Sequence, residues 1–170
     1  MCDTDVDKVK PSVLTLAKYL RNNINLIDNN RLVPFRKELE YNDEYIALEK
    51  IRFEDKINIS YDIQVSDFML PTFTLQPLIE NAIRHGIRPK KGIGNIKIST
   101  KESETAYLLI ISDDGVGFRN TIQKDGIAHI GLSNIRTRIN MLIGGTVNVN
   151  SILGEGTTVT VSIPKRRSEK

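Results

Sequence analysis

The end of the chain carries two runs that alternate apolar and polar residues, at 147–152 and 157–163, separated by a Gly-Glu-Gly turn at 154–156. Each run predicts a half-buried β-strand, and a turn this short joins only antiparallel neighbours. Residues 57–63 alternate in the same way and predict another strand. A chain with this ending is therefore expected to fold around a sheet that contains antiparallel strands.

Spacing of apolar residues by three and four positions predicts helices in the rest of the chain, with short apolar runs predicting further strands. The helices are expected over residues 6–28, 35–53, 75–87 and 132–143, and the further strands over 96–99 and 107–112. This mixture favours an α+β fold with an antiparallel-rich sheet and helices on one face. The first two helices are as typical of a dimerisation hairpin as of ordinary packing on the domain.

The net charge of +3 is concentrated at one end of the chain, where four basic residues and one acidic residue follow Pro164. Since the remainder is electrically balanced, no basic face for nucleic acid is expected. The single cysteine excludes an internal disulfide and, with only two histidines, argues against a Cys/His zinc site. No stretch approaches the roughly 20 apolar residues of a membrane-spanning helix. A soluble chain without direct membrane contact is therefore expected.

The sequence lacks the GxxxxGK[ST], GxGxxG and GxSxG motifs, which leaves three local features that could carry chemistry. The first is Asn81, which shares a helix face with Arg84 and His85, three and four residues further on. An amide oxygen beside groups that reach phosphate could hold a magnesium–phosphate group. Alternatively, these residues form a polar face in solvent.

The second feature is Asp113, which ends an apolar strand and is followed by Gly115 and Gly117. A carboxylate at a strand end can accept a hydrogen bond from an exocyclic amine, and the glycines permit close approach or positive φ. A plain turn is the other interpretation. The third feature is Gly131-Leu132-Ser133-Asn134, which opens a helix whose N–H groups could bind an anion or be capped by the side chains.

The order of these features is more specific than any one of them. An Asn-bearing helix, DxGxG, GLxN and the final GxGT at Gly154–Thr157 match the N, G1, G2 and G3 boxes of the GHKL ATP-binding superfamily. More narrowly, LQPLIENAIRHG at 75–86 closely resembles the LQPLVENAIKHG segment of LytS/YesM-type sensor histidine kinases. YIALEKIRF at 45–53 is similar to the YLxLExxRF helix of that group, and residues 131–139 resemble its GLxNxxxRL. The resemblance extends from about Leu14 to Pro164.

This resemblance implies the Bergerat α+β two-layer sandwich, a mixed, largely antiparallel sheet backed by helices and preceded by an N-terminal helical segment. It also implies that the site binds ATP and Mg²⁺. In that site Asn81 would ligate Mg²⁺, Arg84 and His85 would face the phosphates or ribose as catalytic residues, and Asp113 would accept from the adenine amino group. The remaining cofactor-binding residues would be Gly115 and Gly117 at the base, Thr157 beside Asp113 through water, and Gly131 with Leu132 near the phosphates.

The implied function is transfer of the ATP γ-phosphate to a histidine and then to an aspartate on a response regulator. Residues 1–33 would be part of the dimerisation and phospho-acceptor region, and 34–170 the catalytic domain, with residues 119–130 as a lid. The parent protein would be a homodimer and a membrane receptor, and this chain would be its cytoplasmic part. Two alternatives stay open: a nucleotide-binding scaffold without phosphotransfer, and an anti-sigma-type protein serine kinase.

Three departures from the family pattern accompany these expectations. The NPHFLFN-like segment with the acceptor histidine is absent, so the chain is expected to be a piece of a longer receptor that cannot autophosphorylate alone. His129 stands where a glycine often precedes GLxN. Pro77 occupies the position, one turn before Asn81, where a glutamate activates water in the gyrase and chaperone branch, which argues against an efficient ATPase.

Overall fold

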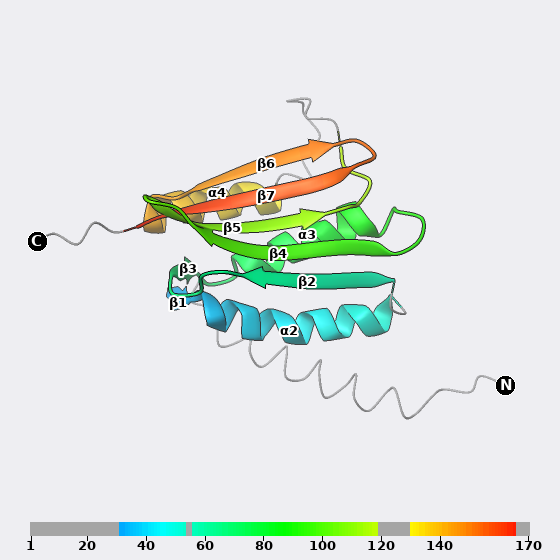
Figure 1. The fold of residues 1–170 in the computed structure, drawn as a ribbon, viewed down its shortest axis with the longest axis horizontal. Coiled ribbons are helices and arrows are strands. Elements are labelled where there is room, and N and C mark those ends of the chain that lie inside the picture. The colour runs from blue at the N-terminus through cyan, green and yellow to red at the C-terminus, as the bar shows by residue number, and fades with distance from the viewer. Residues whose placement is uncertain (1–30, 54–55, 119–129, 166–170) are drawn as a thin grey trace, which may run out of the picture.

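The computed structural model describes residues 31–53, 56–118 and 130–165 (Figure 1), so the helix expected over 6–28 lies outside the described part. The elements in chain order are β1 (Leu32–Pro34), α2 (Phe35–Arg52), β2 (Ile57–Ile63), β3 (Met69–Pro71), α3 (Leu75–Asn81), the π-helix η1 (Ala82–Ile87), β4 (Gly94–Glu102), β5 (Ala106–Asp113), α4 (Ile130–Ile143), β6 (Thr146–Ile152) and β7 (Gly156–Pro164). Every helix and strand predicted within the described residues is present.

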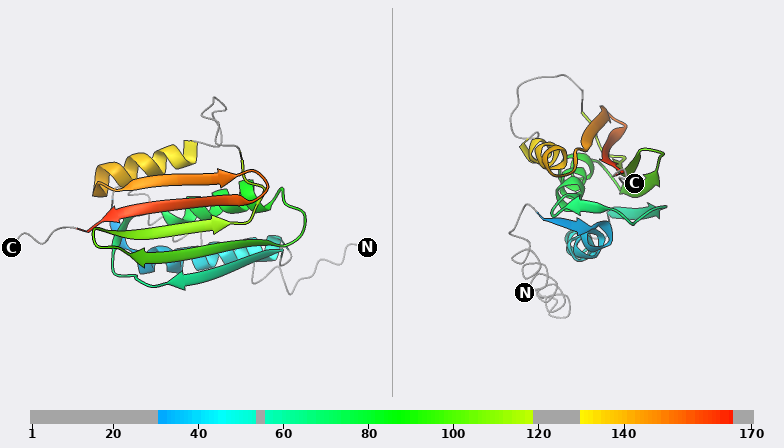
Figure 2. Two further views of the ribbon diagram at one scale, coloured as in Figure 1. Left: turned by 45° about the horizontal axis from the view of Figure 1, so that its top comes forward. Right: turned by 90° about the vertical axis from the view of Figure 1, so that its left-hand side faces the viewer.

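Five strands form the main sheet in the order β2-β4-β5-β7-β6, and β1 pairs with β3 in a separate two-stranded sheet. In the main sheet β2 runs parallel to β4, and the other three pairings are antiparallel. The helices cover one face of this sheet (Figure 2). The predicted α+β sandwich with a mixed, largely antiparallel sheet is therefore confirmed.

The core lies between the sheet and the helices and follows from the alternation in the strands. Ile98 on β4 pairs with Ile111 on β5, which in turn pairs with Val159 on β7, and all three are buried. Their strand neighbours Lys97 and Thr160 point to the opposite, open face, where Lys97 is exposed. Aliphatic burial of this kind supplies most of the favourable folding free energy, at about 25 cal/mol per Å² of apolar surface.

The helix that carries Asn81 differs from its prediction as one continuous α-helix over 75–87. It is α-helical to Asn81 and continues as the π-helix η1, closed by a 2.8 Å bond from Arg88 N–H to the Ile83 carbonyl. The Gly86 carbonyl accepts instead from Val116 N–H in the loop after β5, at 3.0 Å. The widened turn therefore lies where the helix meets this loop. Such turns are frequent at functional sites.

The start of the described chain is fastened to the domain by aromatic packing. Phe35 stacks on Phe68 with ring centroids 4.8 Å apart, and Phe68 stacks on Tyr107 at 5.4 Å. Since these rings come from α2, from the segment before β3 and from β5, they join the first described helix to the central strand of the main sheet. The expected domain boundary between residues 33 and 34 falls within β1, and it stays a prediction.

Candidate functional site

Asp113 lies at the end of β5, opposite Thr157 in the register with β7. Its Oδ1 accepts a hydrogen bond from the backbone N–H of Gly115 at 2.9 Å. Burial raises the pKa of Asp113 above its ordinary value, while the backbone N–H groups of Gly115 and Thr157 and the ammonium of Lys90 act in the opposite direction. Since a carboxylate has about four acceptor positions, Asp113 keeps acceptor capacity for a further donor.

The carboxylate of the next residue, Asp114, is engaged by donors from other segments of the chain. Its carboxylate accepts from Asn95 N–H at 2.8 Å and from Asn95 Nδ2 at 2.6 Å, and it pairs with Lys90 Nζ at 2.8 Å. Burial raises the pKa of Asp114, but these donors outweigh that effect and leave the pKa below its ordinary value. Asp114 therefore fastens the loop to β4. Asp113 is the carboxylate that can still accept a hydrogen bond from a ligand.

Glycines surround Asp113 where the chain passes close to itself. A Cβ on Gly86 would overlap the Asp113 carboxylate, standing 2.8 Å from Cγ, and a Cβ on Gly115 would overlap the backbone of Gly86. Gly156 has φ +122, and a Cβ there would lie 2.9 Å from the Asp113 carbonyl carbon. Gly117 also has positive φ, at +57. Close approach of the chain to itself therefore requires glycine at Gly115, Gly86 and Gly156. The approach of a ligand to Gly115 stays a prediction, and the sequence indicated Gly86 and Gly156 only as a helix stop and a hairpin turn.

Asn81 lies at the junction of α3 and η1 and is half-buried. Its Nδ2 is buried and has no hydrogen-bond partner among the residues that the structure describes. Arg84 and His85 follow on η1 and are exposed. The side chain of Glu80 is bound by Gln76 Nε2 at 2.8 Å. The amide of Asn81 is thus the buried polar group on this helix that a ligand could satisfy.

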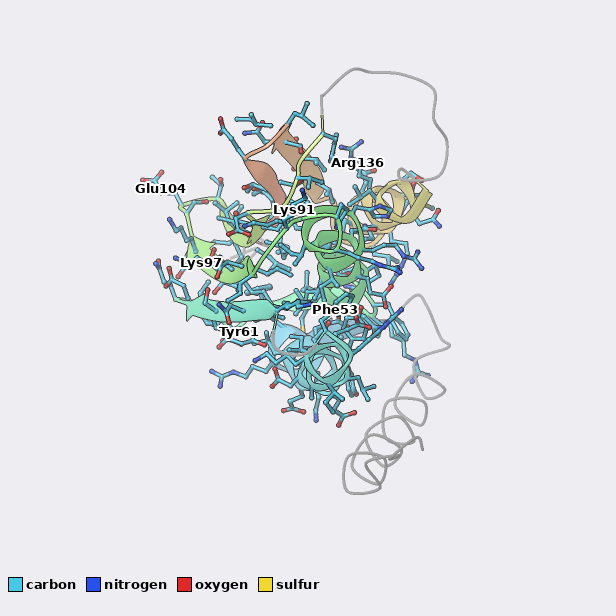
Figure 3. All side chains as sticks on the ribbon, turned by 90° about the vertical axis from the view of Figure 1, so that its right-hand side faces the viewer. Phe53, Tyr61, Lys91, Lys97, Glu104 and Arg136 are labelled. Atoms are coloured by element: carbon cyan, nitrogen blue, oxygen red, sulfur yellow. The ribbon has the colours of Figure 1, made fainter. Side chains whose placement is uncertain are left out.

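The two parts of the predicted site are joined directly by the bond from Val116 N–H to the Gly86 carbonyl. That bond connects the helix of Asn81 to the loop that follows Asp113. Figure 3 looks onto this end of the molecule, with Lys91 labelled just after η1 and with the helices and the sheet seen end-on. The structure therefore brings together the Asn81 helix and the DxGxG loop, as the motif order predicts.

Thr157 lies beside Asp113 through β7, but its hydroxyl is bound by Ser151 Oγ at 2.9 Å. The same Ser151 hydroxyl contacts the Gly156 carbonyl at 3.1 Å and accepts from Phe118 N–H at 2.9 Å. Ser151 therefore holds together the hairpin and the loop that flank Asp113. Sequence reasoning missed this residue because a serine in a strand carries no local signal of such contacts.

Gly131 and Leu132 lie in the first turn of α4, and Leu132 is half-buried against the core. Their expected contact with phosphates stays a prediction. The expected lid over 119–130 and His129 fall outside the described residues, apart from Ile130 at the start of α4.

Two kinds of feature are absent from the part of the chain that the structure describes, a metal-binding cluster and a membrane-spanning helix. No group of three or more His, Cys, Asp or Glu side chains that could hold a metal ion occurs among the described residues. Mg²⁺ at phosphates is commonly bound through one or two protein oxygens together with the phosphate oxygens, so such a site need not contain a group of this kind. Within the same residues, no helix is both long and apolar enough to cross a membrane.

The fold and the motifs together define an ATP-binding domain of the α+β sandwich class. Residues 69–167 match the family described as "Histidine kinase-, DNA gyrase B-, and HSP90-like ATPase", and the chain belongs to that family. Residues 1–57 match a second family, described as "Histidine kinase". The resemblance to the GHKL superfamily seen in the sequence is thereby confirmed.

Relatives of the chain include named sensor proteins. It is 34% identical to the Sensor histidine kinase YpdA of Escherichia coli over 95% of its own length and 30% of that protein. It is 32% identical to the Sensor protein LytS of Streptococcus mutans over 98% of its length and 30% of that protein. The chain therefore spans about a third of the length of these relatives.

A solved structure shares the fold of the chain. The histidine kinase ThkA, in complex with the response regulator protein TrrA, matches all of this chain and 55% of its own with a TM-score of 0.60 and 15% identity. At that identity the likeness concerns the fold alone.

Proposed function

We propose that this chain is the ATP-binding catalytic part of a sensor histidine kinase and transfers the γ-phosphoryl group of ATP to a histidine. The observation that carries the proposal is the half-buried Asp113 carboxylate, packed against Gly86 on the helix that presents Asn81. The family and the sensor kinase relatives support it. Residues 1–33 would then belong to the dimerisation and phospho-acceptor region, and 34–170 to the catalytic domain.

Asp113 would select adenine by charge and hydrogen-bond polarity. A carboxylate only accepts hydrogen bonds, so it pairs with the exocyclic amine of adenine and opposes the carbonyl of guanine at the same place. Gly115 and Gly117 would let the backbone lie against the base, and Thr157 would contribute through a bridging water. The loop therefore supplies nucleotide selectivity but no reacting group.

The phosphate end would be held by the helices. The buried, unpaired Nδ2 of Asn81 fits a donor to a phosphate oxygen, and the amide oxygen of the same side chain would be a ligand of Mg²⁺. Arg84 and His85 are exposed beside it and can reach phosphate oxygens, and Gly131 with Leu132 would meet the phosphates from α4. When bound, a magnesium ion would supply charge neutralisation at the phosphates, which is the main requirement of phosphoryl transfer.

The acceptor would come from the upstream segment that carries the phosphorylated histidine in the family. Its neutral imidazole nitrogen would form a P–N bond to the γ-phosphorus as the bond to the β–γ bridging oxygen breaks and ADP leaves. The phosphohistidine would then give the same group to an aspartate oxygen of a response regulator. The kinase ThkA, which shares this fold and forms a complex with the response regulator protein TrrA, supports that partner. A cytoplasmic location and a homodimeric parent belong to the same proposal.

The experiment supplies the missing acceptor. The chain is mixed with a separate peptide that carries the family's NPHFLFN segment and with ATP labelled in its γ-phosphate, and the control peptide has its histidine replaced by alanine. We expect label on the first peptide alone, labile to acid. Tight ATP binding without labelling would support a scaffold, and stable phosphoserine on a partner would support the serine kinase, so either result would overturn the proposal.

A further inference from the structure

The start of α3 is bound by a carboxylate from another helix. Glu38 on α2 accepts three backbone hydrogen bonds, with Oε1 receiving Phe73 N–H at 2.9 Å and Oε2 receiving Thr74 N–H at 3.0 Å and Leu75 N–H at 2.9 Å. These are N–H groups that a helix start leaves without internal partners. Thr74, the residue at the N-cap position, makes no capping bond and gives its hydroxyl to the Pro71 carbonyl at 2.6 Å. Glu38 therefore replaces the usual local cap.

The placement of Glu38 is costly without these contacts, because its side chain is only 2% exposed. Burial raises the pKa of Glu38, while the backbone N–H groups of Leu75, Phe73 and Thr74 and the charge of Arg138 oppose that rise. A charged group this deep in the fold is stable only where several donors meet it. The donors come from one turn, so the carboxylate and the turn fix each other.

The same turn is held from the opposite side by α4. Arg138 donates from Nη2 to the Thr72 carbonyl and from Nη1 to the Phe73 carbonyl, the latter at 3.5 Å. Phe73 has φ +57, a left-handed conformation that a residue with a bulky side chain adopts at a cost. The turn over residues 72–75 is thus a fixed point, with its N–H groups bound by α2 and its carbonyls by α4.

This turn and the nucleotide site lie at opposite ends of the same two helices. α3 and α4 run in opposite directions (Figures 1 and 2). Asn81 lies six residues beyond Leu75, and Arg138 lies seven residues beyond Gly131. At 1.5 Å per residue, both spans are about 10 Å of helix. A shift of the turn would therefore act first on Asn81 relative to Gly131. Asp113 is held by the backbone N–H groups of Gly115 and Thr157 and meets this helix beyond Asn81, at Gly86.

We propose that Glu38 and Arg138 are positioning residues that set where Asn81 stands in the nucleotide site. The inference rests on the proposed function, since it concerns the phosphate end of the same site. Glu38 and Arg138 touch the turn and no reacting atom, so their effect is on geometry alone. Their loss should weaken the magnesium-dependent part of ATP binding and spare the adenine contact.

The test compares ATP affinity with Mg²⁺ and with EDTA in the whole chain, by calorimetric titration of folded samples. In Glu38→Gln the amide nitrogen faces N–H groups that need an acceptor, so the turn loses part of its anchor. We expect the gain in affinity from magnesium to fall by about fivefold or more, as for a coupling of 1 kcal/mol or above. The affinity in EDTA should stay within about twofold of the unchanged chain.

The matched control is Glu40→Gln, the same change on the same helix at a side chain that is 61% exposed and pairs only with Lys37 among the described contacts. It should leave both affinities unchanged. Arg138→Lys is a second variant, which keeps the charge and loses the fork that reaches two carbonyls, and it should repeat the effect of Glu38→Gln. If Glu38→Gln does not fold, the magnesium effect in Arg138→Lys tests the positioning role instead.

The titrations distinguish failure of the proposed function from failure of the positioning role. If the unchanged chain binds no ATP, or binds it equally with and without magnesium, the proposed function fails. If it shows the magnesium effect and the folded variants keep that effect within about twofold, the positioning role is wrong. An equal loss with Mg²⁺ and with EDTA would also overturn it, because general destabilisation would affect both measurements alike.

Discussion

Gly86 packs so closely on the Asp113 carboxylate that a side-chain carbon on the glycine would stand 2.8 Å from Cγ and 3.2 Å from Oδ2. The carboxylate cannot simply turn away, because backbone N–H groups of Gly115 and Thr157 bind it. In Gly86→Ala the carboxylate or the helix must therefore move. We expect a loss of stability of about 1–3 kcal/mol, as for other overpacked sites, and weaker ATP binding measured by calorimetric titration.

Gly144→Ala is the control for that variant. Gly144 has φ +66, but a Cβ there meets nothing within 4 Å. Alanine should therefore cost about 1 kcal/mol of backbone strain and leave the affinity for ATP unchanged. If both variants lowered ATP affinity equally, the close packing of Gly86 on Asp113 would not be the cause.

Asp113→Asn tests the adenine contact. A hydrogen bond to a charged group is worth about 1.5–3 kcal/mol, so ATP affinity should fall by roughly 10- to 100-fold. The control is Asp114→Asn, whose carboxylate binds Asn95 and Lys90 and is 40% exposed. Solvent screening limits the cost of that change to about 1 kcal/mol of stability, with no change in ATP affinity. A loss of less than about twofold in Asp113→Asn would rule out the adenine assignment.

The pH dependence of ATP binding follows from the same carboxylate. Burial raises the pKa of Asp113 above 3.8, so the group takes up its proton at a higher pH than an exposed aspartate. As the pH falls through that raised value the acceptor is lost and ATP affinity declines. The effect of Asp113 on folding stability has the opposite sign. Because its pKa is higher in the folded chain than in the unfolded chain, protonation of Asp113 favours the folded state, and this contribution is lost as the pH rises through the folded-state pKa.

Comparison of the unchanged chain with Asp113→Asn, in the same buffers, removes the titration of ATP itself. The variant should bind weakly at every pH and lack the acid decline that is due to Asp113. Parallel pH curves for the two proteins would contradict an ionised Asp113 as the acceptor.

Asn81→Ala tests the phosphate end of the site. Its amide oxygen is the proposed ligand for Mg²⁺, so the variant should lose about 1–3 kcal/mol of ATP binding with magnesium present. Much less should be lost in EDTA. The control is Asn140→Ala, an exposed amide on α4, which should bind as the unchanged chain does. Equal losses with and without magnesium would exclude the ligand role of Asn81.

Much of the fold could be predicted from local patterns. The alternation over residues 57–63 gives β2 with the bounds that the structure has, and the helix expected over 35–53 is α2 to within one residue. These elements bury one face, so their period is visible in the sequence. The short strands β1 and β3 were missed because three residues are too few to show a period, and Pro34 ends one of them.

The candidate site was predictable only where a motif marks it. Asp113 and Asn81 are indicated by their neighbours in sequence, whereas Glu38 acts on residues 35 to 37 positions away. A contact at that distance leaves no local pattern. The change from α to π geometry after Asn81 is equally invisible, because no local residue pattern marks the bond from Arg88 N–H to the Ile83 carbonyl that closes the widened turn.

The parallel pairing of β2 with β4 also governs the order in which the domain can assemble. Parallel neighbours cannot be joined by a tight turn and need a crossover, which here consists of β3, α3 and η1. Pairing of β2 with β4 therefore closes a loop that contains the helix of Asn81, and such long-range closure is slow. The helix of Asn81 and the edge strand thus belong to the same closed segment of the chain. Nucleotide held at the helix should consequently slow hydrogen exchange in β2, a strand that contributes none of the proposed ligand-binding residues.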